Sequence, residues 1–105
     1  MTTTRRIETL DDLTSYLHSL FGPDIVPSVM NHYEVMFTVD GKVRKVMAAL
    51  QENTGREGWD GDTSFWFYRN DALNVGIGLA SAPGCVMVMA TIDSLHREAL
   101  RPYGS

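Results

Sequence analysis

The stretch that decides the fold spans residues 64–92 and reads SFWFYRNDALNVGIGLASAPGCVMVMATI. Three runs rich in aromatic and aliphatic residues are separated by two turn signals, Asn70-Asp71 and Pro83-Gly84. Asn and Asp tolerate a positive φ angle, and Pro-Gly suits a type II turn, so both pairs predict tight reversals of the chain. The stretch therefore predicts an antiparallel meander of three strands.

Successive side chains of a β-strand point to opposite sides of the sheet, so this meander has two predicted faces. The first face carries ordinary core residues: Phe65, Phe67, Leu73, Val75, Ile77, Leu79, Val86 and Val88. The second face carries Trp66, Tyr68, Asn74, Gly76, Gly78, Ala80, Met87 and Met89. Because the second face is not polar, we expect a helix, another chain or a ligand to cover it. Our candidate binding residues are Trp66, Tyr68, Gly76, Gly78, Met87 and Met89, together with Trp59 in the preceding loop.

A helix is predicted over residues 10–21, on the N-terminal side of the meander. Thr9 is a suitable N-cap with Asp12 in the capping-box position, and Gly22 followed by proline is a typical helix end. Leucines recur at helical spacing, so the helix is amphipathic and should cover the first face of the meander. Residues 1–8 are expected to form a frayed arm.

Two segments lie between this helix and the meander. Residues 32–39 alternate between apolar and polar side chains and predict a half-exposed strand. Residues 42–54 allow two interpretations. Asp40-Gly41 favours a hairpin and a return strand, whereas an apolar pattern with helical spacing favours a helix. A helix here could cover the second face of the meander, and a strand would leave that face as an apolar patch.

These elements predict a single α+β domain over residues 1–105. Its core is one antiparallel sheet, a meander of four to five strands, with the N-terminal amphipathic helix and one or two further helices. Residues 23–31 and 55–62 are predicted to be loops. A short C-terminal helix is expected over residues 95–101 and should stop at Pro102.

Composition narrows the classes of function. The chain has 105 residues and a formal net charge of −4, from 9 basic and 13 acidic residues. This balance disfavours nucleic acid as a partner and is compatible with a basic protein surface. Cys85 is the only cysteine, so no intrachain disulfide can form. The N-terminal residues lack a signal-peptide core and no run is long enough to span a membrane, so we expect a cytoplasmic protein without membrane contact.

Familiar catalytic, metal and nucleotide patterns are not supported by the sequence. Gly76-Ile77-Gly78 lacks the third glycine of a dinucleotide loop, and we interpret its glycines as positions covered by Trp66 and Tyr68. Asp60-Gly61-Asp62 does not continue as a calcium loop and predicts a polar turn. The three histidines share no metal-binding spacing with one another or with Cys85. We therefore predict no catalytic residue, metal or cofactor.

Three functional hypotheses remain open. The first is a small acidic, non-enzymatic binding protein that acts on another macromolecule as an inhibitor, immunity or anti-defence protein, through its apolar aromatic and methionine face. The second is a dimeric small-molecule binding or sensor protein with a pocket lined by the same residues. The third is a small enzyme that uses His32, with Tyr33 or Glu34 beside it. The partner is accordingly expected to be another protein, a second copy of the chain, or a small molecule.

Overall fold

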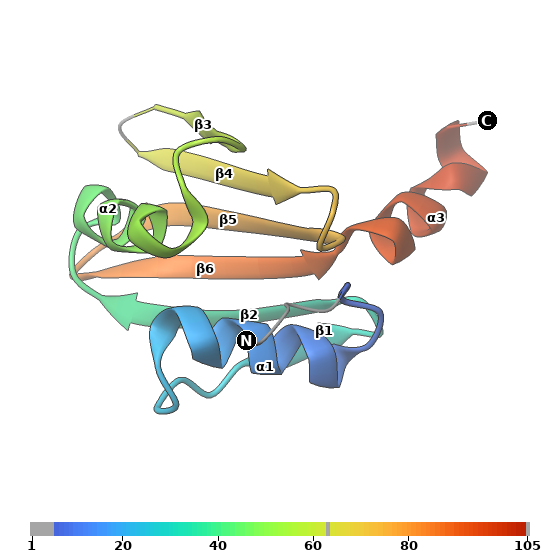
Figure 1. Ribbon diagram of the computed structural model, residues 1–105, viewed down its shortest axis with the longest axis horizontal. Helices are drawn as coiled ribbons and strands as arrows, with labels where there is room; N and C mark the ends of the chain where they lie inside the picture. The colour runs from blue at the N-terminus through green and yellow to red at the C-terminus, as the bar shows by residue number, and fades with distance from the viewer. Residues whose placement is uncertain (1–5, 63, 105) are drawn as a thin grey trace.

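The computed structural model describes residues 6–62 and 64–104, which form one six-stranded antiparallel sheet and three helices (Figure 1). The strands lie in the order β1-β2-β6-β5-β4-β3. The predicted α+β class with a single antiparallel sheet is confirmed. In chain order the elements are α1 (Leu10–Phe21), β1 (Ser28–Asn31), β2 (Glu34–Asp40), α2 (Val43–Thr54), β3 (Trp59–Gly61), β4 (Phe65–Asn70), β5 (Val75–Ala82), β6 (Cys85–Ile92) and α3 (Asp93–Gly104).

The sheet has more strands than the sequence predicts. Strands β1 and β3 are short edge strands in segments that were expected to be loops, so the sheet has six strands instead of four to five. β1 pairs with β2, where Val29 lies opposite Val35, and β3 pairs with β4, where Trp59 lies opposite Tyr68. With four and three residues, these strands are too short to carry a clear alternation of their own. Their pairing depends on the neighbouring strand.

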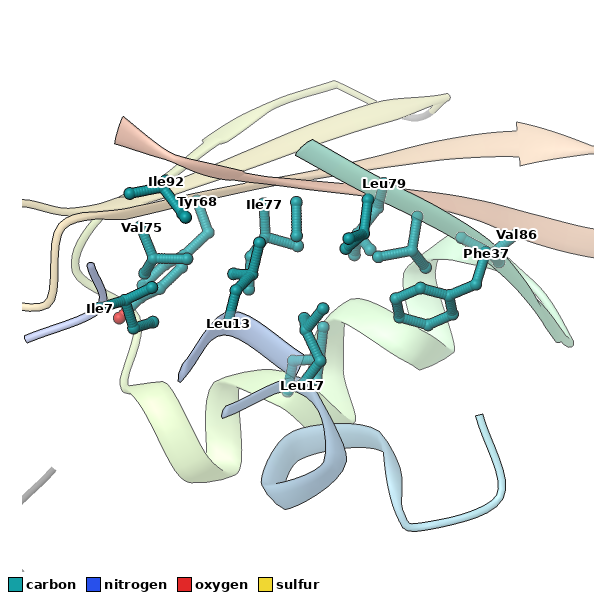
Figure 2. Packing of buried hydrophobic residues seen from close by; sticks show 14 of the residues in the cluster. Ile7, Leu13, Leu17, Phe37, Tyr68, Val75, Ile77, Leu79, Val86 and Ile92 are labelled. Atoms are coloured by element: carbon teal, nitrogen blue, oxygen red, sulfur yellow. The ribbon is translucent and has the colours of Figure 1, made fainter. Parts of the chain in front are cut away.

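Helix α1 forms where the sequence predicts it. The Thr9 side chain accepts a hydrogen bond from the Asp12 backbone N–H, and the Asp12 carboxylate accepts one from the Thr9 backbone N–H. This reciprocal pair is the predicted capping box. Leu13 and Leu17 are fully buried, and Figure 2 shows both side chains pointing from α1 towards the sheet.

The ambiguous segment 42–54 is a helix, α2, and the alternative hairpin is wrong. Gly41 has a φ angle of 120°, which turns the chain out of β2 before the helix begins. Val43 and Leu50 are buried in the core cluster, so the apolar stripe of the segment is satisfied by packing on the sheet. Burial of this stripe outweighs the local hairpin signal.

The N-terminal segment is anchored, at least from Ile7 onwards. Ile7 is only 1% exposed, and its backbone N–H donates to the Leu73 carbonyl at 2.8 Å. The expectation of a frayed arm over residues 1–8 therefore fails at Ile7, while residues 1–5 lie outside the described residues. Burial of the Ile7 side chain and this backbone hydrogen bond together hold the segment against the core.

Asn74 joins three parts of the chain. Its side-chain amide nitrogen donates to the Ile7 carbonyl at 2.9 Å and to the Ser94 hydroxyl at 2.7 Å. Its side-chain oxygen accepts a hydrogen bond from the Ser94 backbone N–H at 2.7 Å, at the first turn of α3. Asn74 is buried and has a φ angle of 64°, which asparagine tolerates better than most residues. It is a structural joint and does not belong to the second face, where the sequence placed it.

Helix α3 continues directly from β6 and projects away from the sheet (Figure 1). It extends to Gly104, so Pro102 does not end it as predicted. The Asp93 carboxylate near its start is held by Arg69 of β4 and by Arg97 one turn later. Within the described ranges 6–62 and 64–104, every helix is too short or too polar to cross a bilayer.

Helices α1 and α2 lie on the same side of the sheet. Figure 2 shows both helices beneath one layer of strands, with Leu17, Ile77 and Leu79 between them. Branched aliphatic residues of β5 and β6 on this side are completely buried. We call this side the covered face and the opposite side, over which neither α1 nor α2 lies, the open face.

Candidate functional site

The register of the sheet identifies the residues of the open face. Residues directly opposite each other in antiparallel strands point to the same side of the sheet. Gly78 lies opposite Met89 of β6 and Phe67 of β4, and Met89 lies opposite Met36 of β2. Extending this register gives the open face: Ser28, Glu34, Met36, Thr38, Asp40, Asp60, Phe65, Phe67, Arg69, Gly76, Gly78, Ala80, Ala82, Cys85, Met87, Met89 and Thr91.

The predicted assignment of β4 to the two faces is wrong. The turn between β4 and β5 contains four residues, 71–74, and pairs Asn70 with Val75. Across a turn with an even number of residues, odd-numbered residues of one strand pair with even-numbered residues of the next, and paired side chains point to the same side of the sheet. Phe65 and Phe67 therefore share the open face with the glycines, although the sequence placed them in the core.

Trp59, Trp66 and Tyr68 lie on the covered face. Tyr68 is 2% exposed, and its ring packs against the Trp59 ring with centroids 5.1 Å apart. The indole N–H of Trp59 donates to the Thr54 hydroxyl at the end of α2, at 3.0 Å. Burial, with a smaller contribution from Tyr68, raises the pKa of Tyr16 on α1 well above its ordinary value. These aromatic residues fill the space under the helices and are not available on the open face.

The phenylalanine rings of β4 cover the glycines of β5. A Cβ atom placed on Gly76 would lie 3.1 Å from the Phe67 ring, and one on Gly78 would lie 3.5 Å from the Phe65 ring. The predicted packing of aromatic rings over strand glycines is therefore present, with different aromatic residues. Phe65 and Phe67 remain 42% and 37% exposed. The rings lie over the strand glycines and expose apolar surface on the open face.

Methionines extend this surface across the sheet. Met87 and Met89 share the open face with the glycines, as the sequence predicts. Met36 of β2 lies opposite Met89, and all three side chains are half-buried. Methionine side chains are flexible and polarizable, and they adapt to the shape of a partner.

A hollow of about 220 Å³ lies at the end of the open face that is nearest to α3. Its apolar part is formed by the two phenylalanines, the two glycines and one methionine. Its polar part comes from β2, β4, β6 and α3, so segments far apart in the sequence meet there. The lining residues are Glu34, Phe65, Phe67, Arg69, Gly76, Gly78, Met89, Thr91, Asp93 and His96.

The charges in this hollow are only partly balanced. Asp93 is 6% exposed, and its two carboxylate oxygens lie 3.4 Å from Arg69 and 2.9 Å from Arg97. Glu34 forms no ion pair with any residue in the described part of the chain. The His96 Nδ1 atom is buried and has no hydrogen-bond partner among those residues, while the ring packs against Tyr33 at 5.6 Å. The Glu34 carboxylate is thus left without a counter-ion in the described part of the chain.

Carboxylates also surround the apolar centre of the open face. Glu34 and Asp40 lie at the two ends of β2, and Asp60 lies on β3, opposite Phe67. Asp40 and Asp60 are exposed, and Glu34 is half-buried. Arg69, the one open-face residue with a cationic side chain, is already engaged with Asp93. The open face is therefore apolar at its centre and acidic at its edges.

Two other polar residues singled out from the sequence, His32 and Asp62, do not line the hollow. His32 lies in the exposed turn between β1 and β2, with its ring against Tyr33, and does not line the hollow. No group of three or more His, Cys, Asp or Glu side chains in residues 6–62 and 64–104 could hold a metal ion. The predicted polar turn over residues 60–62 is wrong for Asp60 and Gly61, which belong to β3. Hydrogen bonds from Ser64 and Phe65 lower the pKa of the Asp62 carboxyl group.

Sequence reasoning missed Phe65, Phe67, Arg69, Asp93 and His96 as members of one site. The phenylalanines could have been found by counting residues across the β4–β5 turn. Asp93 and His96 reach the site because α3 continues β6 without a loop, and no sequence signal that we identified predicts this.

Comparisons of the chain with protein-family models, with curated proteins and with solved structures found no match. The geometry of the open face is therefore what bears on function.

Proposed function

We propose that this protein binds another protein through the open face of its sheet and acts as an inhibitor, immunity or anti-defence type of protein. The observation that carries the proposal is that both α1 and α2 pack on the covered face, leaving Phe65, Phe67 and the methionines without a helical cover. Apolar aromatic and methionine side chains are enriched in the centres of protein interfaces. A charged or polar rim around such a centre is the usual arrangement.

The partner should carry basic side chains around an apolar centre. Glu34, Asp40 and Asp60 surround the open face, and the whole chain has a formal net charge of −4. Complementary charges at the rim accelerate association and exclude wrong partners, and their effect decreases with salt. An acidic rim therefore selects for a basic protein.

A small molecule fits the hollow near α3 less well than a protein side chain does. The hollow of about 220 Å³ is smaller than the sites of roughly 300–1,000 Å³ that bind drug-sized ligands. It is large enough for a single side chain.

A second copy of the chain is also disfavoured as the occupant. Two open faces brought together would place the rim carboxylates of one copy near those of the other, and like charges in an interface are costly. The basic residues Lys42, Arg44 and Lys45 belong to the start of α2, on the other side of the sheet. They cannot neutralise the rim in a face-to-face dimer.

The test compares two substitutions that add the same charge. Phe67→Asp changes the open face, and Ala49→Asp changes an exposed position on α2. The wild-type protein is used to capture partners from a host extract, and the identified partner is then purified for affinity measurements. We expect a partner with a basic surface whose affinity falls at least about 30-fold with Phe67→Asp and changes little with Ala49→Asp.

Salt and self-association provide further checks. The affinity should decrease between low and high NaCl concentrations, because the rim contacts are exposed. Equal effects of the two variants, or an acidic partner, would contradict the proposal. Self-association in light scattering that Phe67→Asp abolishes would assign the open face to a second copy. Circular dichroism and thermal melting confirm that both variants are folded.

A further inference from the structure

We infer that the hollow at the α3 end of the open face receives an arginine side chain of the partner protein. This inference rests on the proposed function, because it names the group that the open face recognises. The inference assigns one side chain of the partner to one place on the open face, in addition to the apolar centre and the acidic rim.

Charge selects a cation for the hollow. Of its lining carboxylates, Asp93 is neutralised by Arg69 and by Arg97, whereas Glu34 forms no ion pair in the described part of the chain. One carboxylate without a counter-ion therefore faces a hollow that a partner would seal from water. A buried charge of this kind is costly unless the partner supplies the opposite charge.

Hydrogen-bonding capacity selects guanidinium over ammonium. A guanidinium group carries five N–H donors in a rigid plane, so it can donate two parallel hydrogen bonds to the Glu34 carboxylate. A lysine ammonium is a compact charge on a flexible stem and cannot form this paired arrangement with a carboxylate.

The apolar part of the hollow suits the stem of an arginine. Phe65, Phe67 and Met89 line it, and the two phenylalanine rings lie against Gly78 and Gly76. The methylene groups of an arginine can pack on this surface, and its planar head can stack on an aromatic ring. Placing a Cβ atom on Gly76 would crowd both the Phe67 ring and the Thr91 hydroxyl, each at 3.1 Å. The packing of this part of the hollow therefore depends on glycine at position 76.

The experiment is an NMR titration of the full chain with N-acetyl-arginine amide, using N-acetyl-citrulline amide as the uncharged analogue of similar shape. We expect chemical-shift changes at the amides of Gly76, Gly78 and Met89 with the arginine derivative. The citrulline derivative should bind about tenfold more weakly, because it lacks the charge-assisted hydrogen bond. Glu34→Gln, which preserves shape and removes the charge, should weaken arginine binding by a similar factor.

Several results would overturn the inference. These are equal binding of the two compounds, unchanged arginine binding by Glu34→Gln, shift changes confined to another part of the chain, or the absence of any change. N-acetyl-lysine amide is titrated in parallel, and binding as tight as that of the arginine derivative would contradict the choice of guanidinium. The amide spectrum of Glu34→Gln verifies its fold.

The titration and the Phe67→Asp comparison can fail independently, so the arginine inference and the proposed function are tested separately. If a basic protein binds the open face in the Phe67→Asp comparison while the arginine derivative does not bind the hollow, only the arginine inference is wrong. If the derivative binds and no protein uses the open face, the proposed function is wrong and the hollow is a site for free guanidinium compounds.

Discussion

The two faces of the sheet are built from the same strands and follow different packing rules. On β6, Val86, Val88 and Ile92 point to the covered face and are fully buried, whereas Met87 and Met89 point to the open face and are half-buried. The covered face uses stiff, branched side chains, which fix a single packing arrangement. The open face uses glycine, phenylalanine and methionine, which form a surface that can adapt. Apolar composition alone does not distinguish the covered face from the open face, but the choice of apolar residue does.

The largest expected difference between the faces is in stability. Leu79→Ala on the covered face should lower the free energy of unfolding by about 2–5 kcal/mol, because it leaves a cavity in a packed core. Met87→Ala, on the neighbouring strand but on the open face, should cost less than about 1.5 kcal/mol, since its side chain is only partly removed from water. Urea denaturation measures both values. Similar losses would show that the open face is as tightly packed as the covered face.

The next largest effect on stability is expected at Asn74, which holds Ile7 and the start of α3 together. Asn74→Ala should destabilise the protein by about 1–3 kcal/mol, because the Ile7 carbonyl and the Ser94 backbone N–H lose their partner. Asn74→Gly makes the positive φ angle easy to adopt but also removes the hydrogen bonds. The difference between the two variants in urea denaturation isolates the backbone strain. If neither variant loses stability, Asn74 does not hold α3 in place.

A pH-dependent effect on stability is expected at high pH from Tyr16, on the covered side of the sheet. Burial raises the pKa of Tyr16 in the folded protein above the ordinary value of about 10. As the pH rises, the unfolded chain releases this proton first. Tyr16 therefore makes its full contribution to the free energy of unfolding below about pH 10. Above that pH the free energy of unfolding falls by up to about 1.4 kcal/mol per pH unit.

Tyr16→Phe isolates this term. The free energy of unfolding of the wild type and of the variant is measured from about pH 9 to pH 11, and the wild type should fall more steeply. Parallel curves would show that Tyr16 is accessible to water in the folded protein.

The smallest effects are expected at the glycines of the open face. Gly76→Ala should cost about 1 kcal/mol, because the added methyl group would lie 3.1 Å from both Phe67 and Thr91. Gly78→Ala should be neutral or stabilise by up to about 1 kcal/mol, since its nearest neighbour lies at 3.5 Å and alanine restricts the unfolded chain. Thermal melting compares the two. The reverse order would mean that the phenylalanine rings do not lie over the glycines as described.

Much of the fold could be predicted because its signals are local. Helix α1 follows from Thr9, Asp12 and a leucine stripe, and the pairing of β5 with β6 follows from the two-residue turn at Pro83-Gly84. The two edge strands could not be predicted, because strands of three or four residues depend on a neighbour that is distant or weakly patterned.

The candidate site was predicted in part. Gly76, Gly78, Met87 and Met89 share a face in both the sequence interpretation and the structure. The sequence interpretation assigns Phe65 and Phe67 to the core face and Trp66 and Tyr68 to the second face, which is the reverse of the structure. It does not take into account the number of residues in the turn between β4 and β5. Hydrophobicity could not resolve this choice, since both sets are aromatic.

The alternation along β6 has a consequence for how the protein can change over generations. Because the side chains that stabilise the fold and those that are proposed to contact a partner occupy separate positions of the same strand, a substitution at Met87 or Met89 can alter recognition at little expense in stability. A protein of this construction could follow a partner whose surface drifts. We expect homologous chains to differ most at the open-face positions and least at Val86, Val88 and Ile92.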